Sequence, residues 1–323
     1  MDYIISVTNK CNLKCQYCYE KRLNTTLGAI NDKTGDRIIK FINEANDANI
    51  VYLFGGEPLL YKDLLKKFIT SIKAKRFVIT SNGMLLDEHF ARWCSEHKTI
   101  INVSHDGKDC SARGIKAEEL SEKVKMLLKY QPDTLLQLVY TEKTMKDLYE
   151  NTLYFKDMGI KFVSYVMDSF LEVDDMDTFA DELKDVWEKV VDVEGITVKE
   201  LRYKEEIVKG KRNSKCEICK KKLFINWDGK IYPCVQFQNL SDFQCGDIFK
   251  GIDTSKAEAR YKNYSNMSER CLDCEISQYC DNSCACKKMS STGGLDNISE
   301  AQCIEQQVLI LTVLNKFKRM GRF

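Results

Sequence analysis

Short apolar runs alternate with amphipathic stretches from the start of the chain to about residue 196. Continuous runs of this length, rich in β-branched and aromatic residues, are typical of buried strands. Strands that alternate with helices build a parallel sheet through right-handed crossovers, which curl it toward a barrel. Six units cannot close an eight-stranded barrel, so the sequence predicts an α/β fold with a partial (β/α)6 barrel. The predicted strands are residues 3–7, 51–54, 77–80, 100–103, 135–140 and 162–166.

The predicted helices between these strands carry apolar residues at a 3.6-residue period. We interpret these stripes as core faces without a further role. They comprise Leu60, Leu64, Phe68 and Ile72; Leu120, Val124 and Leu127; and Phe179, Leu183, Val186 and Val190.

Beyond residue 196 the alternation stops and cysteines become frequent. The chain has 15 cysteines in 323 residues and no signal peptide, which favours metal or cluster ligation over disulfides. Residues 223–234 predict a hairpin with Asp228 and Gly229 at its turn. We therefore predict a partial barrel over 1–196, a cysteine-rich domain over 197–303, and a C-terminal helix with a basic tail over 304–323.

Charge and hydropathy exclude several classes of partner. The net charge is +1, so no nucleic-acid or membrane partner is expected. The apolar run 308–314 is too short to cross a bilayer. The basic run 209–222 lacks interleaved aromatic residues, and we assign it to charge compensation of thiolates or to an acidic peptide leader. A reducing cytoplasmic location is the expectation.

Three thiols follow the first predicted strand, at Cys11, Cys15 and Cys18. A loop with this set can bind three irons of a four-iron cluster and leave the fourth open for a small molecule. The alternative is a partial zinc site. Zinc sites usually pair CxxC with a second CxxC or with histidines, and His89, His97 and His105 have no such spacing.

Other strand ends carry polar or glycine-rich turns, where active sites of parallel barrels lie. The second strand is followed by Gly55, Gly56, Glu57 and Pro58, and paired glycines let the backbone approach a ligand closely. Ser81 and Asn82 follow the third strand. Ser104 ends the fourth, and Arg113 comes shortly after it.

The cysteine spacing, with Tyr19 after the last thiol, resembles the signature of the radical S-adenosylmethionine (radical SAM) superfamily. The resemblance implies that the open iron chelates the methionine part of SAM and that the GGEP sequence binds its amino group. It also implies that Ser104 reaches the ribose and Arg113 the carboxylate. Tyr19 lies near the adenine or is a structural tyrosine, and His105 is expected to be a solvated loop residue.

The later cysteines resemble the SPASM domain of radical SAM peptide and protein maturases. By this resemblance two auxiliary four-iron clusters join the SAM-binding one, giving three 4Fe-4S clusters. A zinc-ribbon staple is the alternative. Four cysteines stay outside every pattern: Cys94, Cys110, Cys245 and Cys286. Cys94 is expected in the core. Cys245 and Cys286 are expected to be spare structural thiols, and the alternative is that one of them donates a hydrogen atom or ligates iron. The implied ligands are Cys271, Cys274, Cys280 and Cys303 for the outer cluster and Cys219, Cys234 and Cys284 for the inner one, with Cys216 as its fourth ligand unless that iron is open to a substrate thiolate.

The resemblance implies an oxidoreductase that forms a 5′-deoxyadenosyl radical and removes a hydrogen atom from a ribosomally made peptide. A thioether or another cross-link ranks first, and epimerisation second. Formylglycine formation ranks low because Val235 follows Cys234, where sulfatase maturases carry an aspartate base. A non-catalytic iron–sulfur carrier or scaffold would leave Gly55–Pro58 and Arg113 without a purpose.

The expected partners follow from this chemistry. They are a peptide or protein segment as substrate and a cellular reductant such as flavodoxin or ferredoxin. Because the chain starts directly on the first barrel strand, we expect a peptide leader to bind a separate protein or the barrel surface, unless leader binding is unnecessary.

Overall fold

The computed structural model describes residues 1–23, 26–212, 221–264, 269–280, 284–295 and 297–321, without the side chains of 260–264 and 269–270. The chain divides into two compact units, each discontinuous in sequence. The first unit comprises residues 1–105, 110–134 and 217–262, and the second comprises 106–109, 135–216 and 263–323.

A parallel sheet forms the centre of the first unit. Its strands β1 (Asp2–Thr8), β2 (Ile50–Gly55), β3 (Arg76–Ser81) and β4 (Thr99–Ser104) are neighbours in chain order. The register places Ile5 beside Leu53, Leu53 beside Ile79, and Ile79 beside Ile101. All four side chains are fully buried, so one row of the core runs across the strands.

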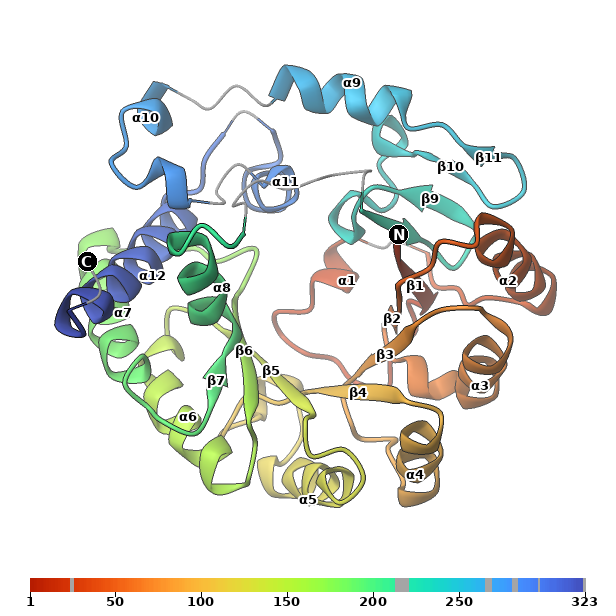
Figure 1. Cartoon of the computed structure of the whole chain (residues 1–323), viewed down its shortest axis with the longest axis horizontal. Helices are drawn as coiled ribbons and strands as arrows, with labels where there is room; N and C mark the ends of the chain where they lie inside the picture. The colour runs from red at the N-terminus through yellow and green to blue at the C-terminus, as the bar shows by residue number, and fades with distance from the viewer. Residues whose placement is uncertain (24–25, 213–220, 265–268, 281–283, 296, 322–323) are drawn as a thin grey trace. The chain divides into compact units, whose positions relative to one another are not determined.

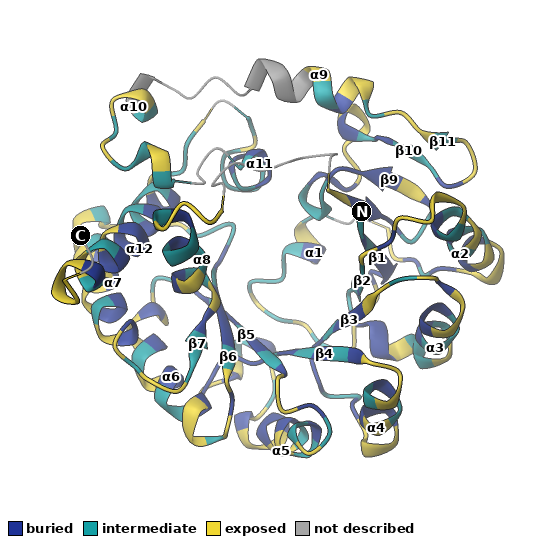
Figure 2. Cartoon of the chain, in the orientation of Figure 1, coloured by how far each residue is buried: buried dark blue, intermediate teal, exposed yellow. Residues whose placement is uncertain are grey.

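Helices cover this sheet unequally. The longer helices α2 (Asp32–Ala45), α3 (Lys62–Ser71), α4 (Glu88–Glu96) and α5 (Ala117–Leu128) lie on the outer side of the strands, and the short α1 (Tyr19–Leu23) lies on the other side (Figure 1). Their buried residues face the strands and their exposed residues face outward (Figure 2). Asn31 and Asp87 begin α2 and α4 by accepting hydrogen bonds from the main-chain N–H of Thr34 and Phe90, the usual role of an N-cap.

The predicted apolar stripe after β2 is buried at Phe68 and Ile72 and half-buried at Leu64, but the prediction was wrong for Leu60. Residues Pro58–Tyr61 form a 3₁₀ turn, in which Leu60 is 42% exposed. The buried face of α3 is Leu65, Phe68 and Ile69. Glu57 caps the 3₁₀ turn by accepting from the N–H of Leu59 at 2.9 Å, so the α-helix begins later than the apolar spacing indicates.

Strands from the cysteine-rich half complete the first unit. The strand β8 (Lys222–Ile225) pairs in parallel with β1, and β9 (Lys230–Tyr232) is antiparallel to β8. The predicted hairpin is therefore present, with Gly229 at a φ of +89° in its turn. The rest of this part is β10 (Gly246–Asp247), β11 (Gly251–Ile252) and α9 (Ser255–Tyr264), with 3₁₀ turns at Val235–Phe237 and Ser241–Phe243.

The second unit packs helices around β5 (Leu135–Tyr140), β6 (Phe162–Met167) and β7 (Thr197–Val198). As predicted, α7 (Met176–Val190) buries Phe179, Leu183, Val186 and Val190. The C-terminal α12 (Glu300–Arg319) packs against α7 and α8 (Lys199–Val208). The other elements are α6 (Leu148–Asp157), α10 (Glu269–Leu272), α11 (Ala285–Thr292) and 3₁₀ turns at Met145–Asp147 and Ser277–Tyr279.

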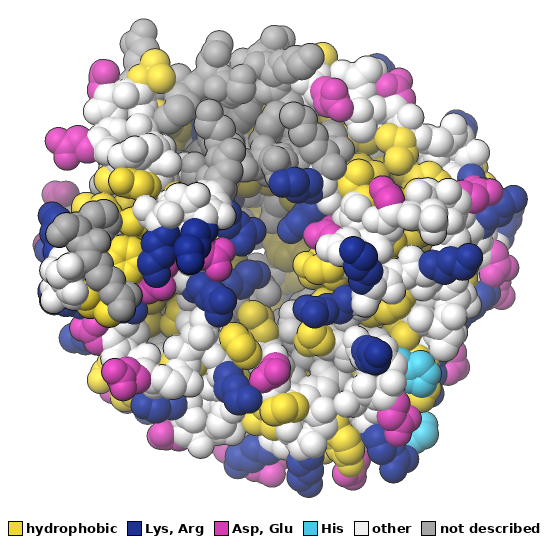
Figure 3. Space-filling view, viewed as in Figure 1, with side chains coloured by type: hydrophobic (Ala, Val, Ile, Leu, Met, Phe, Trp, Pro, Cys, Tyr) yellow, Lys and Arg dark blue, Asp and Glu magenta, His cyan; other side chains and the backbone are white. Residues whose placement is uncertain are grey.

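Surface charge agrees with the near-neutral composition. On the face drawn in Figure 3, basic and acidic side chains both occur around the periphery. In the described parts of the chain, no helix combines the length and the apolar character needed to cross a membrane.

Candidate active site

Three of the predicted ligands lie on the loop that follows β1. Cys11 is exposed, and Cys15 and Cys18 are partly exposed. The N–H of Leu13 donates to Cys11 Sγ at 3.4 Å. Among the residues that the structure describes, no three Cys, His, Asp or Glu side chains converge closely enough to hold one metal ion.

The paired glycines bring the loop after β2 against the cysteine loop. A side chain at Gly55, whose φ is +140°, would place its Cβ 2.1 Å from the carbonyl oxygen of Thr8, and one at Gly56 would place it 2.3 Å from that of Lys10. The N–H of Gly56 donates to Thr8 O at 2.6 Å, and the N–H of Glu57 donates to Lys10 O at 2.9 Å. These glycines are thus required for contact between two loops, a role that the motif alone does not reveal.

Glu57 joins this pair of loops to the one after β3. Its carboxylate, fully buried, accepts from Ser81 Oγ at 2.8 Å and from the N–H of Asn82 at 2.7 Å. Burial raises the pKa of Glu57, although these hydrogen bonds act in the opposite direction. The side chain of Asn82 in turn donates to Asn12 Oδ1 at 2.9 Å and to Cys11 Sγ at 3.7 Å. Hydrogen bonds therefore link the ends of β1, β2 and β3.

The loop after β4 is attached to the same cysteine loop. The N–H of Gln16 donates to the carbonyl of Ala112 at 2.9 Å. The Arg113 guanidinium is buried 5.4 Å from the ring centroid of Tyr17, within cation–π distance. The structure thus gathers the predicted SAM contacts at the carboxyl ends of β1–β4 in one unit: Tyr19, Gly55, Gly56, Glu57, Pro58, Ser81, Asn82, Ser104 and Arg113.

The prediction for His105 was wrong. Its side chain is fully buried, with Nε2 3.0 Å from Ser121 Oγ and Nδ1 3.7 Å from Cys110 Sγ. Burial, helped by the charge of Arg113, lowers the His105 pKa to about 4. His105 directly follows β4 and contacts α5, so it belongs to the core and not to a solvated loop.

Exposure separates the cysteines that were assigned as ligands from those that were not. The predicted auxiliary ligands that the structure describes are all partly exposed, whereas Cys94, Cys110, Cys245 and Cys286 are buried. Thiols that bind a cluster need open space beside sulfur, and core thiols do not. The partly exposed set is Cys234 in the first unit and Cys271, Cys274, Cys280, Cys284 and Cys303 in the second; Cys216 and Cys219 lie outside the described residues.

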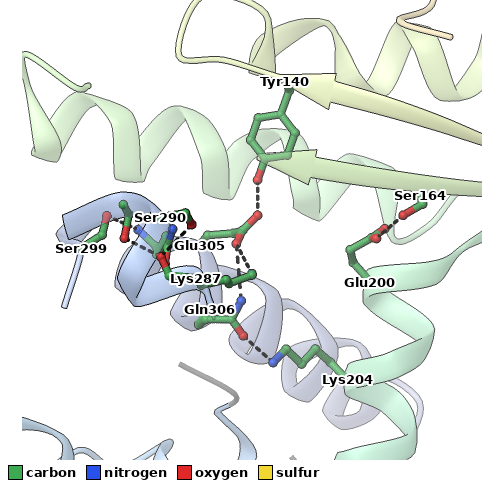
Figure 4. Close-up of polar contacts among 11 residues, drawn as sticks. Tyr140, Ser164, Glu200, Lys204, Lys287, Ser290, Ser299, Glu305 and Gln306 are labelled. Atoms are coloured by element: carbon green, nitrogen blue, oxygen red, sulfur yellow. Dashed lines mark hydrogen bonds and ion pairs between the residues drawn. The ribbon is translucent and has the colours of Figure 1, made fainter. Parts of the chain in front are cut away.

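A polar network around the buried Glu305 and Gln306 in the second unit had not been predicted. Tyr140, the last residue of β5, donates to Glu305 Oε1 at 2.6 Å, and Lys287 lies 3.4 Å from Glu305 Oε2 (Figure 4). Lys204 donates to the neighbouring Gln306. The available signal was a set of polar residues on otherwise apolar helix faces of α8 and α12.

The profile of the radical SAM superfamily matches residues 5–183, more than half of the chain. The chain belongs to the radical SAM superfamily. The SPASM profile, described as an iron–sulfur cluster-binding domain, matches residues 216–275 of this radical SAM protein. Both resemblances seen in the sequence are confirmed, and the chain is an enzyme of this superfamily.

Individual relatives agree with this assignment. A cysteine-type anaerobic sulfatase-maturating enzyme of Clostridium perfringens (strain 13 / Type A) is 24% identical, over 85% of either chain. The structure of native anSMEcpe with bound AdoMet matches with a TM-score of 0.79 and 22% identity, over 99% of this chain and 98% of that one. A structure of Streptococcus suis SuiB bound to precursor peptide SuiA matches with a TM-score of 0.63 and 17% identity, over 94% and 75%. The predicted fold class of the radical SAM chain is thereby confirmed.

Proposed function

We propose that this enzyme removes a hydrogen atom from a peptide and that the product is a thioether or another cross-link. The observation that carries the proposal is the linkage of three strand-end loops around the thiols of the first motif. Asn82 contacts Cys11, and Glu57 holds Asn82 in place. A site built this way orients a small ligand before any reaction begins.

Cys11, Cys15 and Cys18 would hold the SAM-binding cluster, and the later cysteines would hold the two auxiliary ones. When bound, the first cluster and SAM supply the electron and the 5′-deoxyadenosyl radical. The chain would bind the methionine part with Gly55 and Gly56, and would place Arg113 toward the carboxylate. In this proposal the barrel spans 1–196, the SPASM domain 197–303 and the C-terminal segment 304–323.

Two neighbouring structures support a peptide as substrate. Native anSMEcpe was solved with AdoMet and Cp18Cys peptide, and SuiB with its precursor peptide SuiA. By analogy, a peptide or protein segment is the substrate here. The proposed reductant is flavodoxin or ferredoxin, since the first cluster needs an electron.

Formylglycine formation is a second candidate, favoured by the sulfatase-maturating relatives. Against it, Val235 directly follows Cys234 and begins a 3₁₀ turn. That position therefore lacks the carboxylate expected of a base. Epimerisation requires a hydrogen donor, and the cysteines without an assigned ligand role are all buried.

The test is SAM cleavage by anaerobically reconstituted protein with sodium dithionite, followed by mass spectrometry of Cys-containing peptides. Release of 5′-deoxyadenosine that disappears in Cys15→Ala is expected. Loss of two hydrogens from a peptide identifies a cross-link, an aldehyde in place of the thiol identifies formylglycine, and deuterium uptake from heavy water alone identifies epimerisation. A fully loaded protein that never cleaves SAM contradicts the proposal.

A further inference from the structure

The hairpin between β8 and β9 carries a buried carboxamide whose polar atoms are unsatisfied. Asn226 is 1% exposed, and neither its Nδ2 nor its Oδ1 meets a partner among the described residues. Its main chain is fully used, since its N–H donates to Lys230 O and its carbonyl accepts from Gly229, both at 2.9 Å. Burial of a carboxamide without hydrogen bonds costs free energy. The unsatisfied side chain of Asn226 therefore indicates a position where a ligand binds.

A second unsatisfied group lies on the neighbouring strand β1. The parallel register aligns Ile4 with Phe224 and Ile5 with Ile225, and Ser6 and Asn226 are the next residues along the two paired segments. Ser6 is fully buried, and its Oγ also has no partner within the described part of the chain. Since side chains alternate along strands, Ser6 lies on the face of the sheet opposite Ile5, and Asn226 directly follows the paired strand at the same end.

This face is the one next to the cysteine motif. The register of β1 and β2 places Ser6 beside Phe54, and the ring of Tyr19 stacks on Phe54 with centroids 6.4 Å apart. Tyr19 begins α1 directly after Cys18, and α1 lies on the side of the strands opposite α2 and α3 (Figure 1).

The turn that presents Asn226 is held in place by packing. The ring of Trp227 lies so close to Gly28 that a Cβ there would come within 2.3 Å of it. Gly28 is itself bonded to the end of β1, because its carbonyl accepts from Thr8 Oγ1 at 2.7 Å and its N–H donates to Asn9 Oδ1 at 2.6 Å. The unsatisfied groups therefore lie in a preorganised part of the fold.

We infer that Asn226, assisted by Ser6, binds a peptide bond of the substrate. A carboxamide offers both donors and an acceptor, which complement the C=O and N–H of a secondary amide. The inference rests on the proposed function, in which the substrate is a peptide, and adds the residues that hold its main chain.

The first test is thermal unfolding of the reconstituted Asn226→Leu enzyme. Replacing an unsatisfied carboxamide by a side chain of similar shape should leave the melting temperature unchanged or raise it. The matched control is Gln131→Met, since the buried Gln131 donates to Thr99 O at 3.0 Å and accepts from the N–H of Ile101 at 2.8 Å. The control should melt lower than wild type. A drop in Asn226→Leu equal to that of the control would mean a structural role or a bound water, and would overturn the inference.

The second test uses a library of capped, Cys-containing decapeptides, from which those that stimulate 5′-deoxyadenosine release by wild type are selected. For these, Asn226→Leu should raise KM about tenfold and Ser6→Ala about threefold, with kcat kept within about twofold, because a lost ground-state hydrogen bond weakens binding uniformly. Gln131→Met should keep the wild-type KM. Unchanged KM in both site variants overturns this subsite alone, whereas a wild type that no peptide stimulates overturns the proposed function together with it.

Discussion

The carboxylate of Glu57 accepts a hydrogen bond from the main-chain N–H of Asn82 at 2.7 Å, across 25 residues of sequence. A glutamine at position 57 would turn an amide N–H toward one of its three donors. Glu57→Gln should therefore cost about 1–3 kcal/mol of unfolding free energy, measured by urea unfolding of the cluster-free protein. The control is Glu44→Gln, whose exposed carboxylate pairs with Arg37 and should change stability by less than about 0.5 kcal/mol. Equal effects would contradict a special role for Glu57.

Replacing a cysteine of the first motif should abolish activity, whereas replacing a cysteine of the core should not. Cys15→Ala should abolish 5′-deoxyadenosine release, because the motif then retains only two thiols. Cys94→Ala should keep the activity. Burial raises the pKa of Cys94 to about 12, so this thiol stays protonated within the core. Loss of release in both variants would instead indicate a general folding defect.

Replacing a glycine of positive φ by alanine should destabilise the protein by an amount that depends on the space around that glycine. At Gly55 an added Cβ would meet the carbonyl of Thr8, whereas at Gly159, whose φ is +90°, it would meet nothing within 4 Å. Gly159→Ala should cost about 1–2 kcal/mol from backbone strain alone. Gly55→Ala should cost more and should also lower the iron content after reconstitution. Similar iron content in the two variants would argue against the loop contact.

Tyr140→Phe should destabilise the protein more than Tyr165→Phe. Tyr140 donates to the carboxylate of Glu305, which the variant would leave buried with one partner fewer. The hydroxyl of Tyr165 instead shares a hydrogen bond with the hydroxyl of Thr152 at 2.6 Å. Hydrogen bonds to charged groups contribute about 1.5–3 kcal/mol, and those to neutral groups about 0.5–1.5 kcal/mol. Urea midpoints of both variants measure the difference, and a reversed order would refute it.

The free energy of unfolding should decrease as the pH is lowered, because His105 is buried in its neutral form. Its pKa is lowered from 6.5 to about 4 in the folded chain, so the unfolded state binds the proton more tightly. The stabilisation from the neutral ring is complete above about pH 6.5 and is lost as the pH falls to about 4, an effect of about 3 kcal/mol. Unfolding of the cluster-free protein across this range should show a shallower pH dependence in His105→Gln. The exposed control His89→Gln should follow wild type, and identical slopes in all three proteins would disprove the assignment.

The sequence predicted those parts of the fold that depend on local periodicity. Every predicted strand of the barrel is present, and the stripe on α7 is buried as expected. Of the stripe beginning at Leu60, Phe68 and Ile72 are buried as expected, but Leu60 was misplaced because the Glu57 carboxylate caps a 3₁₀ turn that apolar spacing does not reveal.

The sequence motifs of the site could be predicted, but the contacts and hydrogen bonds between them could not. Spacing identified Cys11 and Gly55, but it could not indicate that Gly55 touches the backbone of Thr8 or that Glu57 spans two loops. His105 was misjudged for the same reason, since its hydrogen-bond partner Ser121 lies 16 residues further along the chain. Partners distant in sequence leave no periodic signal.

The pairing of β1 with β8 has a consequence for how such enzymes diversify. A strand from the auxiliary half completes the same sheet as the strand before the radical motif, and α12 packs on α7 and α8. A chimaera that exchanged everything after residue 196 would replace the strand that pairs with β1 and the helix that packs on α7. Recombination between relatives should therefore preserve these contacts. New substrate ranges should then arise by point substitutions within a shared fold and not by exchange of whole domains.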